Sequence, residues 1–146
     1  AIAESFPRMP EFFSTFGGNS VACAAGIAVL DALEHDRLQQ NALRTGEHLL
    51  QGLRELQRSH AVIGDVRGRG LFLGVDLVTD RETRAPATAQ ASYLKERLRE
   101  RRILIGTDGP HDNVLKIRPP MTFDRSAADT LLEELTDLLR EDGARA

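Results

Sequence analysis

Residues 20–35 place the strongest constraint on the fold, because they predict a helix that is apolar on nearly every face. Asn19 or Ser20 supplies a side chain suited to an N-cap, and apolar residues then occupy nearly every position up to Leu33. A helix that is apolar all round is buried on all sides. A chain of 146 residues has too little else to wrap it, so we expect additional protein to cover this helix.

The segment before this helix, residues 1–18, predicts no regular element, because prolines and glycines interrupt it repeatedly. It nevertheless contains four of the six phenylalanines, namely Phe6, Phe12, Phe13 and Phe16. Aromatic surface of this extent needs a packing partner. One possibility is that the segment folds back onto the rest of the domain. We expect instead that its packing partner is protein missing from this sequence, or another chain.

After residue 36 the hydrophobic period alternates between that of a helix and that of a strand. The expected elements are a helix ending near His60, strands at 62–66 and 71–78, a helix at 87–101, strands at 103–106 and 114–118, and a helix that Asp124 caps. This order predicts an α+β fold in which helices cover one face of a small antiparallel sheet. A long linking helix precedes that domain.

Three local sequence motifs add detail to this predicted fold. Asp36 followed by Gln39 resembles a capping box and predicts the start of the second helix. Gly46 weakens that helix locally, by up to about 1 kcal/mol relative to alanine. The glycines of RGRG at 67–70 do not fit a nucleotide-binding loop, because Leu73 occupies the third glycine position and a strand follows. They predict a tight turn.

Composition narrows the classes of partner. A net charge of -3 argues against nucleic acid, whose binding surfaces are basic. No apolar run approaches the length of a membrane span, and scattered histidines give no metal-binding cluster. The single cysteine, Cys23, excludes an internal disulfide and fits a reducing, cytoplasmic compartment. The first residues lack the regions of a signal peptide and an initiator methionine, so we expect the sequence to begin within a longer protein.

Two short segments carry candidate binding chemistry. In STFGGN at 14–19, the hydroxyls of Ser14 and Thr15 and the backbone N–H groups near two glycines precede a helix start, which suits a phosphate. An ordinary loop-to-helix cap fits the same residues. In NVLKIRPPM, Lys116 and Arg118 alternate with apolar residues on a strand. They either form a solvated edge or point at an anionic ligand.

Three segments together resemble a known family: FFSTFGGNSVACAAGIAVLDALE, IGDVRGRGLFLGVDLV and NVLKIRPPM, in this order and at this spacing. They resemble the C-terminal region of class III aminotransferases, which are pyridoxal 5'-phosphate (PLP) enzymes of fold type I. The similarity covers essentially the whole chain. It is strongest to the branch that holds alanine–glyoxylate aminotransferase-like proteins and the phospho-lyases acting on phosphoethanolamine and phosphohydroxylysine.

The resemblance implies a division of the chain into three parts. Residues 1–18 would be the tail of a large PLP domain, residues 19–36 an interdomain helix, and residues 37–146 the small C-terminal domain. It also implies a homodimer, in which Thr15, with Ser14 beside it, reaches the PLP phosphate of the other subunit.

The implied reaction is the transfer of an amino group between an amine or amino acid and a 2-oxo acid. A PLP-dependent phospho-lyase acting on an amino phosphate such as phosphoethanolamine is the alternative. In the family, the lysine that binds PLP covalently lies upstream of this region. We therefore expect no catalytic residue here and no activity from this chain alone. A non-catalytic α+β module for ligand binding or dimerisation is an alternative of a different class.

The sequence departs from the family pattern at two positions. Ser20 stands where most members have proline, and serine is equally acceptable at a helix start. Lys116 stands where many members have an arginine that grips the substrate α-carboxylate, and the phospho-lyase-like branch also has lysine there. The resemblance therefore makes Lys116 a candidate substrate-binding residue and leaves both substrate classes open.

Overall fold

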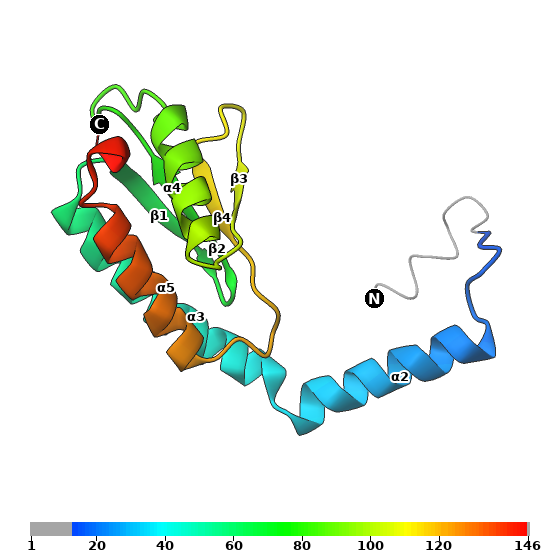
Figure 1. Ribbon diagram of the computed structural model, residues 1–146. Coiled ribbons are helices and arrows are strands. Elements are labelled where there is room, and N and C mark those ends of the chain that lie inside the picture. Colours follow the sequence, from blue (N-terminus) through cyan, green and yellow to red (C-terminus); the bar gives the residue numbers. More distant parts are fainter. Residues whose placement is uncertain (1–12, 146) are drawn as a thin grey trace. The chain divides into compact units, whose positions relative to one another are not determined.

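The computed structural model describes residues 13–145, and these fall into two compact units that divide between Asp36 and Arg37. The first unit contains helix α2 (Ser20–His35), drawn in blue in Figure 1. Residues 1–12 of the predicted N-terminal tail, including Phe6 and Phe12, lie outside the described residues.

The second unit is built from three long helices and four strands, which Figure 1 shows in their arrangement. In chain order these are α3 (Leu38–Ser59), β1 (Ile63–Arg69), β2 (Phe72–Leu77), α4 (Thr88–Glu100), β3 (Gly106–Asp108), β4 (Val114–Ile117), α5 (Arg125–Leu138) and the short 3-10 helix η2 (Asp142–Ala144). The strands pair antiparallel in the order β1-β2-β4-β3. The predicted α+β fold with a small antiparallel sheet and covering helices is confirmed.

The core lies between the sheet and the helices. Alternation along β2 places Leu73, Val75 and Leu77 on the helix side, where each is at most 2% exposed. Leu115 and Ile117 of β4 join them. The helices supply buried leucines at helical spacing: Leu49, Leu53, Leu94, Leu98, Leu131, Leu135 and Leu138. These helices do not cover the opposite face of the sheet, which carries charged residues such as Arg67 and Lys116 together with the exposed Phe72.

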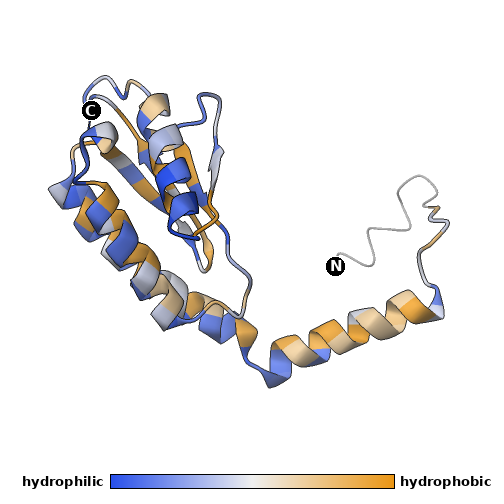
Figure 2. Ribbon diagram, viewed as in Figure 1, coloured by the Kyte–Doolittle hydropathy of each residue, from blue (hydrophilic) through white to orange (hydrophobic). Residues whose placement is uncertain are grey.

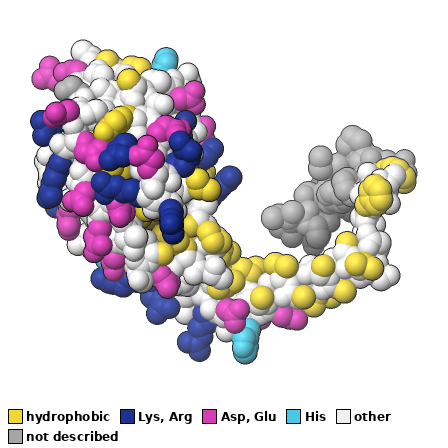
Figure 3. All heavy atoms as spheres, viewed as in Figure 1, with side chains coloured by type: hydrophobic (Ala, Val, Ile, Leu, Met, Phe, Trp, Pro, Cys, Tyr) yellow, Lys and Arg dark blue, Asp and Glu magenta, His cyan; other side chains and the backbone are white. Residues whose placement is uncertain are grey.

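Helix α2 has none of its described side chains buried. Four of its large apolar residues, Val21, Ile27, Val29 and Leu30, are at least 59% exposed, and Leu33 is half-buried. Figures 2 and 3 show hydrophobic residues along its whole length. The predicted apolar helix is therefore present. The expectation that additional protein covers it stays a prediction. Of the helices within residues 13–145, none combines the length and apolarity needed to cross a bilayer.

The predicted capping box at the start of the second helix is wrong. Asp36 instead ends α2, where its backbone N–H donates to Ala32 and Glu34 carbonyl oxygens. Arg37 is the N-cap of α3, with a left-handed backbone (φ 51°) and no hydrogen bond from its side chain to the helix. Two helices that follow one another this closely leave no free residue for a separate capping box.

The predicted strand at 103–106 is also wrong. The strand begins at Gly106 and ends at Asp108. Ile103 and Ile105 pack partly against the core, while Leu104 is 86% exposed. The apolar run therefore marks contact with the core, and hydrogen bonding to β4 begins only after it.

The turn predicted at 67–70 is shorter than expected. Strand β1 continues to Arg69, which pairs with Phe72, so Gly70 and Leu71 form the reversal. Gly70 has φ 55°, in the left-handed region that favours glycine. The residues are a β-hairpin turn, as predicted, and the strand simply extends farther into the motif.

Candidate functional site

The candidate site lies on the uncovered face of the sheet. Because Leu115 and Ile117 point into the core, the intervening Lys116 points to the opposite face. Strand register places Gly74 of β2 and Gly106 of β3 directly opposite Lys116, one on each side. The central strand therefore presents a lysine between two neighbours that have no side chain.

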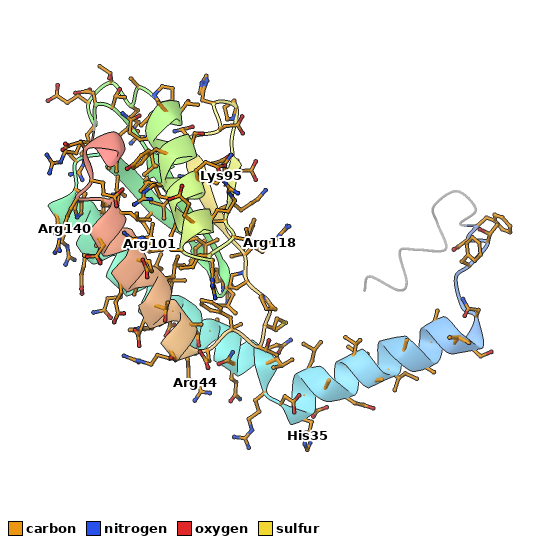
Figure 4. All side chains as sticks on the ribbon, viewed as in Figure 1. His35, Arg44, Lys95, Arg101, Arg118 and Arg140 are labelled. Atoms are coloured by element: carbon orange, nitrogen blue, oxygen red, sulfur yellow. The ribbon has the colours of Figure 1, made fainter. Side chains whose placement is uncertain are left out.

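Lys116 forms an ion pair at the end of β3. Its Nζ lies 2.7 Å from Asp108 Oδ2, and its side chain is 31% exposed. The hydrogen bond from Lys116 lowers the pKa of Asp108 below its usual range, and the Gly109 backbone N–H adds to this effect. The other candidate cation, Arg118, lies just past the end of β4, is exposed and projects away from the sheet (Figure 4).

Two hollows meet at Lys116. One of about 350 Å³ lies over the open face, and its lining includes Arg67, Phe72, Gly74, Asp108 and Lys116. The other, of about 560 Å³, opens beside β3 and the start of α5, and its lining includes Gly106, Lys116, Arg118, Phe123 and Thr130. Among the lining residues of the described chain, Lys116 is the one that the two hollows share.

The second cation near the open face, Arg67, is already neutralised. Its Nη1 donates to Asp65 Oδ2 at 2.8 Å and to Asp76 Oδ2 at 3.3 Å. The hydrogen bond to Asp65 is the main cause of the raised pKa of Arg67. Asn113 Nδ2 also donates to Asp76, at 2.7 Å. Arg67 is therefore held by two carboxylates, whereas Lys116 has one.

The predicted phosphate-binding segment lies in the first unit and leads directly into α2. Ser14 Oγ accepts a hydrogen bond from the Gly17 N–H at 3.0 Å. Asn19 caps the helix, since its Oδ1 accepts from the Ala22 N–H at 2.9 Å. Thr15 is exposed. The segment is thus a helix cap made by Asn19, and the hydroxyls of Ser14 and Thr15 lie just before it.

Sequence reasoning missed three residues around Lys116. Gly74, Gly106 and Asp108 become neighbours of Lys116 only through the pairing of β2 and β3 with β4. A correct alignment of the strand alternation would have placed both glycines opposite the lysine. The misplaced strand at 103–106 prevented that alignment for β3.

Solved structures similar to this chain include a phospholyase and several transaminases. The chain superposes on a phospholyase from Arthrobacter in complex with phosphoethanolamine with a TM-score of 0.84 at 43% identity, covering 94% of this chain and 33% of that one. An amine transaminase from an uncultivated Pseudomonas species, in a PLP-bound form, gives a TM-score of 0.78 at 36% identity, covering 91% and 30%.

The family assignment follows from the sequence as well. Residues 2–139 match the aminotransferase class-III family, so the chain belongs to it. Over 124 residues it is 47% identical to the alanine–glyoxylate aminotransferase 2 homolog 2, mitochondrial, of Arabidopsis thaliana. The matched region covers 85% of this chain and 26% of that protein. The chain spans about a quarter to a third of the length of these relatives.

Proposed function

We propose that the protein containing this chain is a PLP-dependent class III aminotransferase, which transfers an amino group between an amine or amino acid and a 2-oxo acid. The observation that carries the proposal is the half-buried Lys116, which the strand register places on the uncovered face of a class III fold. A cation beside an open hollow suits the anionic group of such a substrate.

The segment before α2 fits the phosphate of PLP. A hydroxyl donates one hydrogen bond while its oxygen accepts others. Ser14 therefore keeps its O–H as a donor although its oxygen accepts from Gly17. Thr15 is exposed beside it, and both precede a helix N-terminus, which favours anions. Ser14 and Thr15 are thus our proposed cofactor-binding residues, acting across a homodimer interface as the resemblance implies.

When bound, PLP supplies an electron-withdrawing ring that stabilises negative charge at the carbon bearing the amine. The residues of this chain would bind and orient around that chemistry. Ser14 and Thr15 would hold the phosphate, and Lys116 would hold the anion of the substrate. Residues 1–18 and 19–36 would belong to the large domain and the interdomain helix, with residues 37–146 as the small domain. The lysine that binds PLP covalently would lie outside this chain.

A phospho-lyase acting on an amino phosphate such as phosphoethanolamine is the second candidate. Two observations favour it: the similarity to the Arthrobacter phospholyase and the presence of lysine at position 116. A lysine ammonium is a compact charge that suits phosphate without requiring the planar geometry of a carboxylate. For the location we propose the cytoplasm, where the unpaired Cys23 would stay reduced.

A product assay tests the proposed function. The complete protein with PLP should aminate a 2-oxo acid at the expense of an amine, whereas the lyase would release inorganic phosphate from phosphoethanolamine. The 146-residue chain with added PLP should give neither product. Turnover by this chain alone would place the covalent lysine at Lys95 or Lys116. Failure of the complete protein to bind PLP would favour the non-catalytic module.

Thr15→Ala should weaken retention of PLP by the complete protein about tenfold, because the change removes one hydrogen bond to a charged phosphate. Equilibrium dialysis followed by PLP quantification measures this. Thr136→Ala is the control, since the Thr136 hydroxyl donates to Leu132 within α5. Unchanged PLP affinity in Thr15→Ala would leave the segment as a helix cap only.

A further inference from the structure

The residues paired with Lys116 on the two neighbouring strands are both glycine, Gly74 and Gly106, and we call the strip between them the glycine lane. A Cβ added at Gly106 would lie 3.9 Å from Lys116 Cε, and one added at Gly74 would lie 3.3 Å from Val114 Cγ1. A side chain at position 106 would therefore contact the lysine stem, whereas one at position 74 would meet Val114. The ammonium at the end of that stem is held by the carboxylate of Asp108.

Asp108 is itself held in a defined orientation. Its Oδ1 accepts from the Gly109 backbone N–H at 2.9 Å, while its Oδ2 accepts from Lys116 Nζ at 2.7 Å. Gly109 has φ 87°, a left-handed conformation at the turn that ends β3. One oxygen is thus fixed by the backbone and the other by the lysine, although the side chain is 58% exposed.

The pairing bears directly on how Lys116 meets an anion. An ammonium has three N–H donors, and within the described residues Asp108 takes one of them. An anionic ligand can use the others, but it then shares one positive charge with a fixed carboxylate. The two anions repel each other. A ligand must either tolerate that repulsion or displace Asp108 from the lysine.

We propose that Asp108 is a positioning residue that acts through Lys116 and sets the selectivity for anionic substrates. In the free protein it holds the ammonium beside the glycine lane, and it competes with the anion of an incoming substrate for that ammonium. Amines with an anionic group bind against this competition, and amines without one do not encounter it. This inference rests on the proposed function in assigning Lys116 to the substrate.

The first experiment measures binding of inorganic phosphate to the 146-residue chain by NMR of 13C-labelled lysine. The sequence has two lysines, so Lys95 on α4 is an internal reference and Lys116→Met assigns the signals. Asp108→Asn should tighten phosphate binding at Lys116 about two- to fivefold, the fold-change expected for an exposed ion pair. Asp108→Glu keeps the charge and should behave like the wild type.

Asp137→Asn is the matched control, because it removes the same charge from an exposed pair between Asp137 of α5 and Arg140, just past the end of that helix. Its phosphate affinity at Lys116 should be unchanged. A gain in Asp137→Asn equal to that in Asp108→Asn would show that net charge alone sets the affinity, which overturns the proposal. An absent, unchanged or weaker phosphate response in Asp108→Asn overturns it as well.

The second experiment uses the complete protein loaded with PLP. Asp108→Asn should lower KM for phosphoethanolamine about two- to fivefold and leave KM for ethanolamine, which lacks the anion, unchanged. Equal changes for both substrates would contradict a role through Lys116. If the wild type acts on neither amine while Lys116 still responds to phosphate as expected, the proposed function fails and the competition between Asp108 and the anion stands.

Discussion

Replacing Gly46 with alanine is expected to lower the free energy of unfolding of the second unit by about 2 kcal/mol or more, in the range for overpacked sites. Gly46 is buried in α3, where an added Cβ would lie 2.1 Å from the carbonyl oxygen of Gly70 and 2.4 Å from its carbonyl carbon. These are backbone atoms of the β1–β2 turn. The overlap can be relieved only if α3 and the β1–β2 hairpin move apart, and that movement disturbs the core between them.

The helix propensity of alanine acts in the opposite direction, by about 1 kcal/mol, and is too small to offset the overlap. Urea unfolding of the 146-residue chain measures the difference. Gly26→Ala in α2 is the control, because nothing lies within 4 Å of its added Cβ and the change should leave the second unit as stable as before. A midpoint for Gly46→Ala at or above that of the wild type would contradict the prediction.

A third glycine allows the stability costs of the substitutions to be ranked. At Gly52, in the same helix, an added Cβ would lie 2.4 Å from Leu132 Cδ1. That atom is the end of a flexible side chain, so Leu132 can change rotamer, and Gly52→Ala should cost less than Gly46→Ala. The order of the three substitutions follows from what each new methyl group meets, because all three positions are helical.

Gly46 also shows what the sequence can and cannot predict. Its helical context was evident from the leucine spacing, and by local propensity the glycine was only a weakness. The reason for it is tertiary, since Gly70 lies 24 positions later and reaches Gly46 only when the hairpin packs on α3. Periodicity identifies which face of a helix is buried, and it does not identify which backbone will approach that face.

The errors in the element boundaries have related causes. The number and order of helices and strands follow from the alternating hydrophobic period, and the structure has the same order. The start of α3 at Leu38 depends on the left-handed backbone of Arg37, for which the sequence carries no strong signal. Strand β3 was misplaced because the apolar run at 103–105 contacts the core without pairing in the sheet.

For the candidate site, strand alternation with the family resemblance was enough to single out Lys116. The carboxylate that pairs with Lys116 was not predictable in the same way. Asp108 lies in a segment that turn-forming residues marked as a loop, and it meets Lys116 only because Gly106–Asp108 pairs with β4. Ser14 and Thr15 were identified from a local motif, and whether they bind PLP is still a prediction.

Changing Lys116 to arginine in the complete protein is expected to shift its substrate preference toward an α-amino acid. An arginine guanidinium holds a carboxylate through two parallel hydrogen bonds, whereas a lysine ammonium acts as a compact point charge. The ratio of kcat/KM for the amino acid to kcat/KM for phosphoethanolamine should rise roughly ten- to a hundredfold. That change corresponds to about 1.5–3 kcal/mol of differential transition-state binding. A Cβ added at Gly106 would lie 3.9 Å from Lys116 Cε, so glycine at that position leaves space beside the side chain at 116.

Arg118 supplies the matched control, because it lies just beyond the end of β4, is exposed and projects away from the sheet (Figure 4). Arg118→Lys should leave the ratio unchanged, since Arg118 is exposed and lies beyond the end of β4. If Lys116→Arg changes both substrates equally, or neither, Lys116 does not discriminate between them. If Arg118→Lys shifts the ratio instead, Arg118 holds the carboxylate. The expected pattern, a response at position 116 alone, would locate the anion of the substrate over the lane between Gly74 and Gly106.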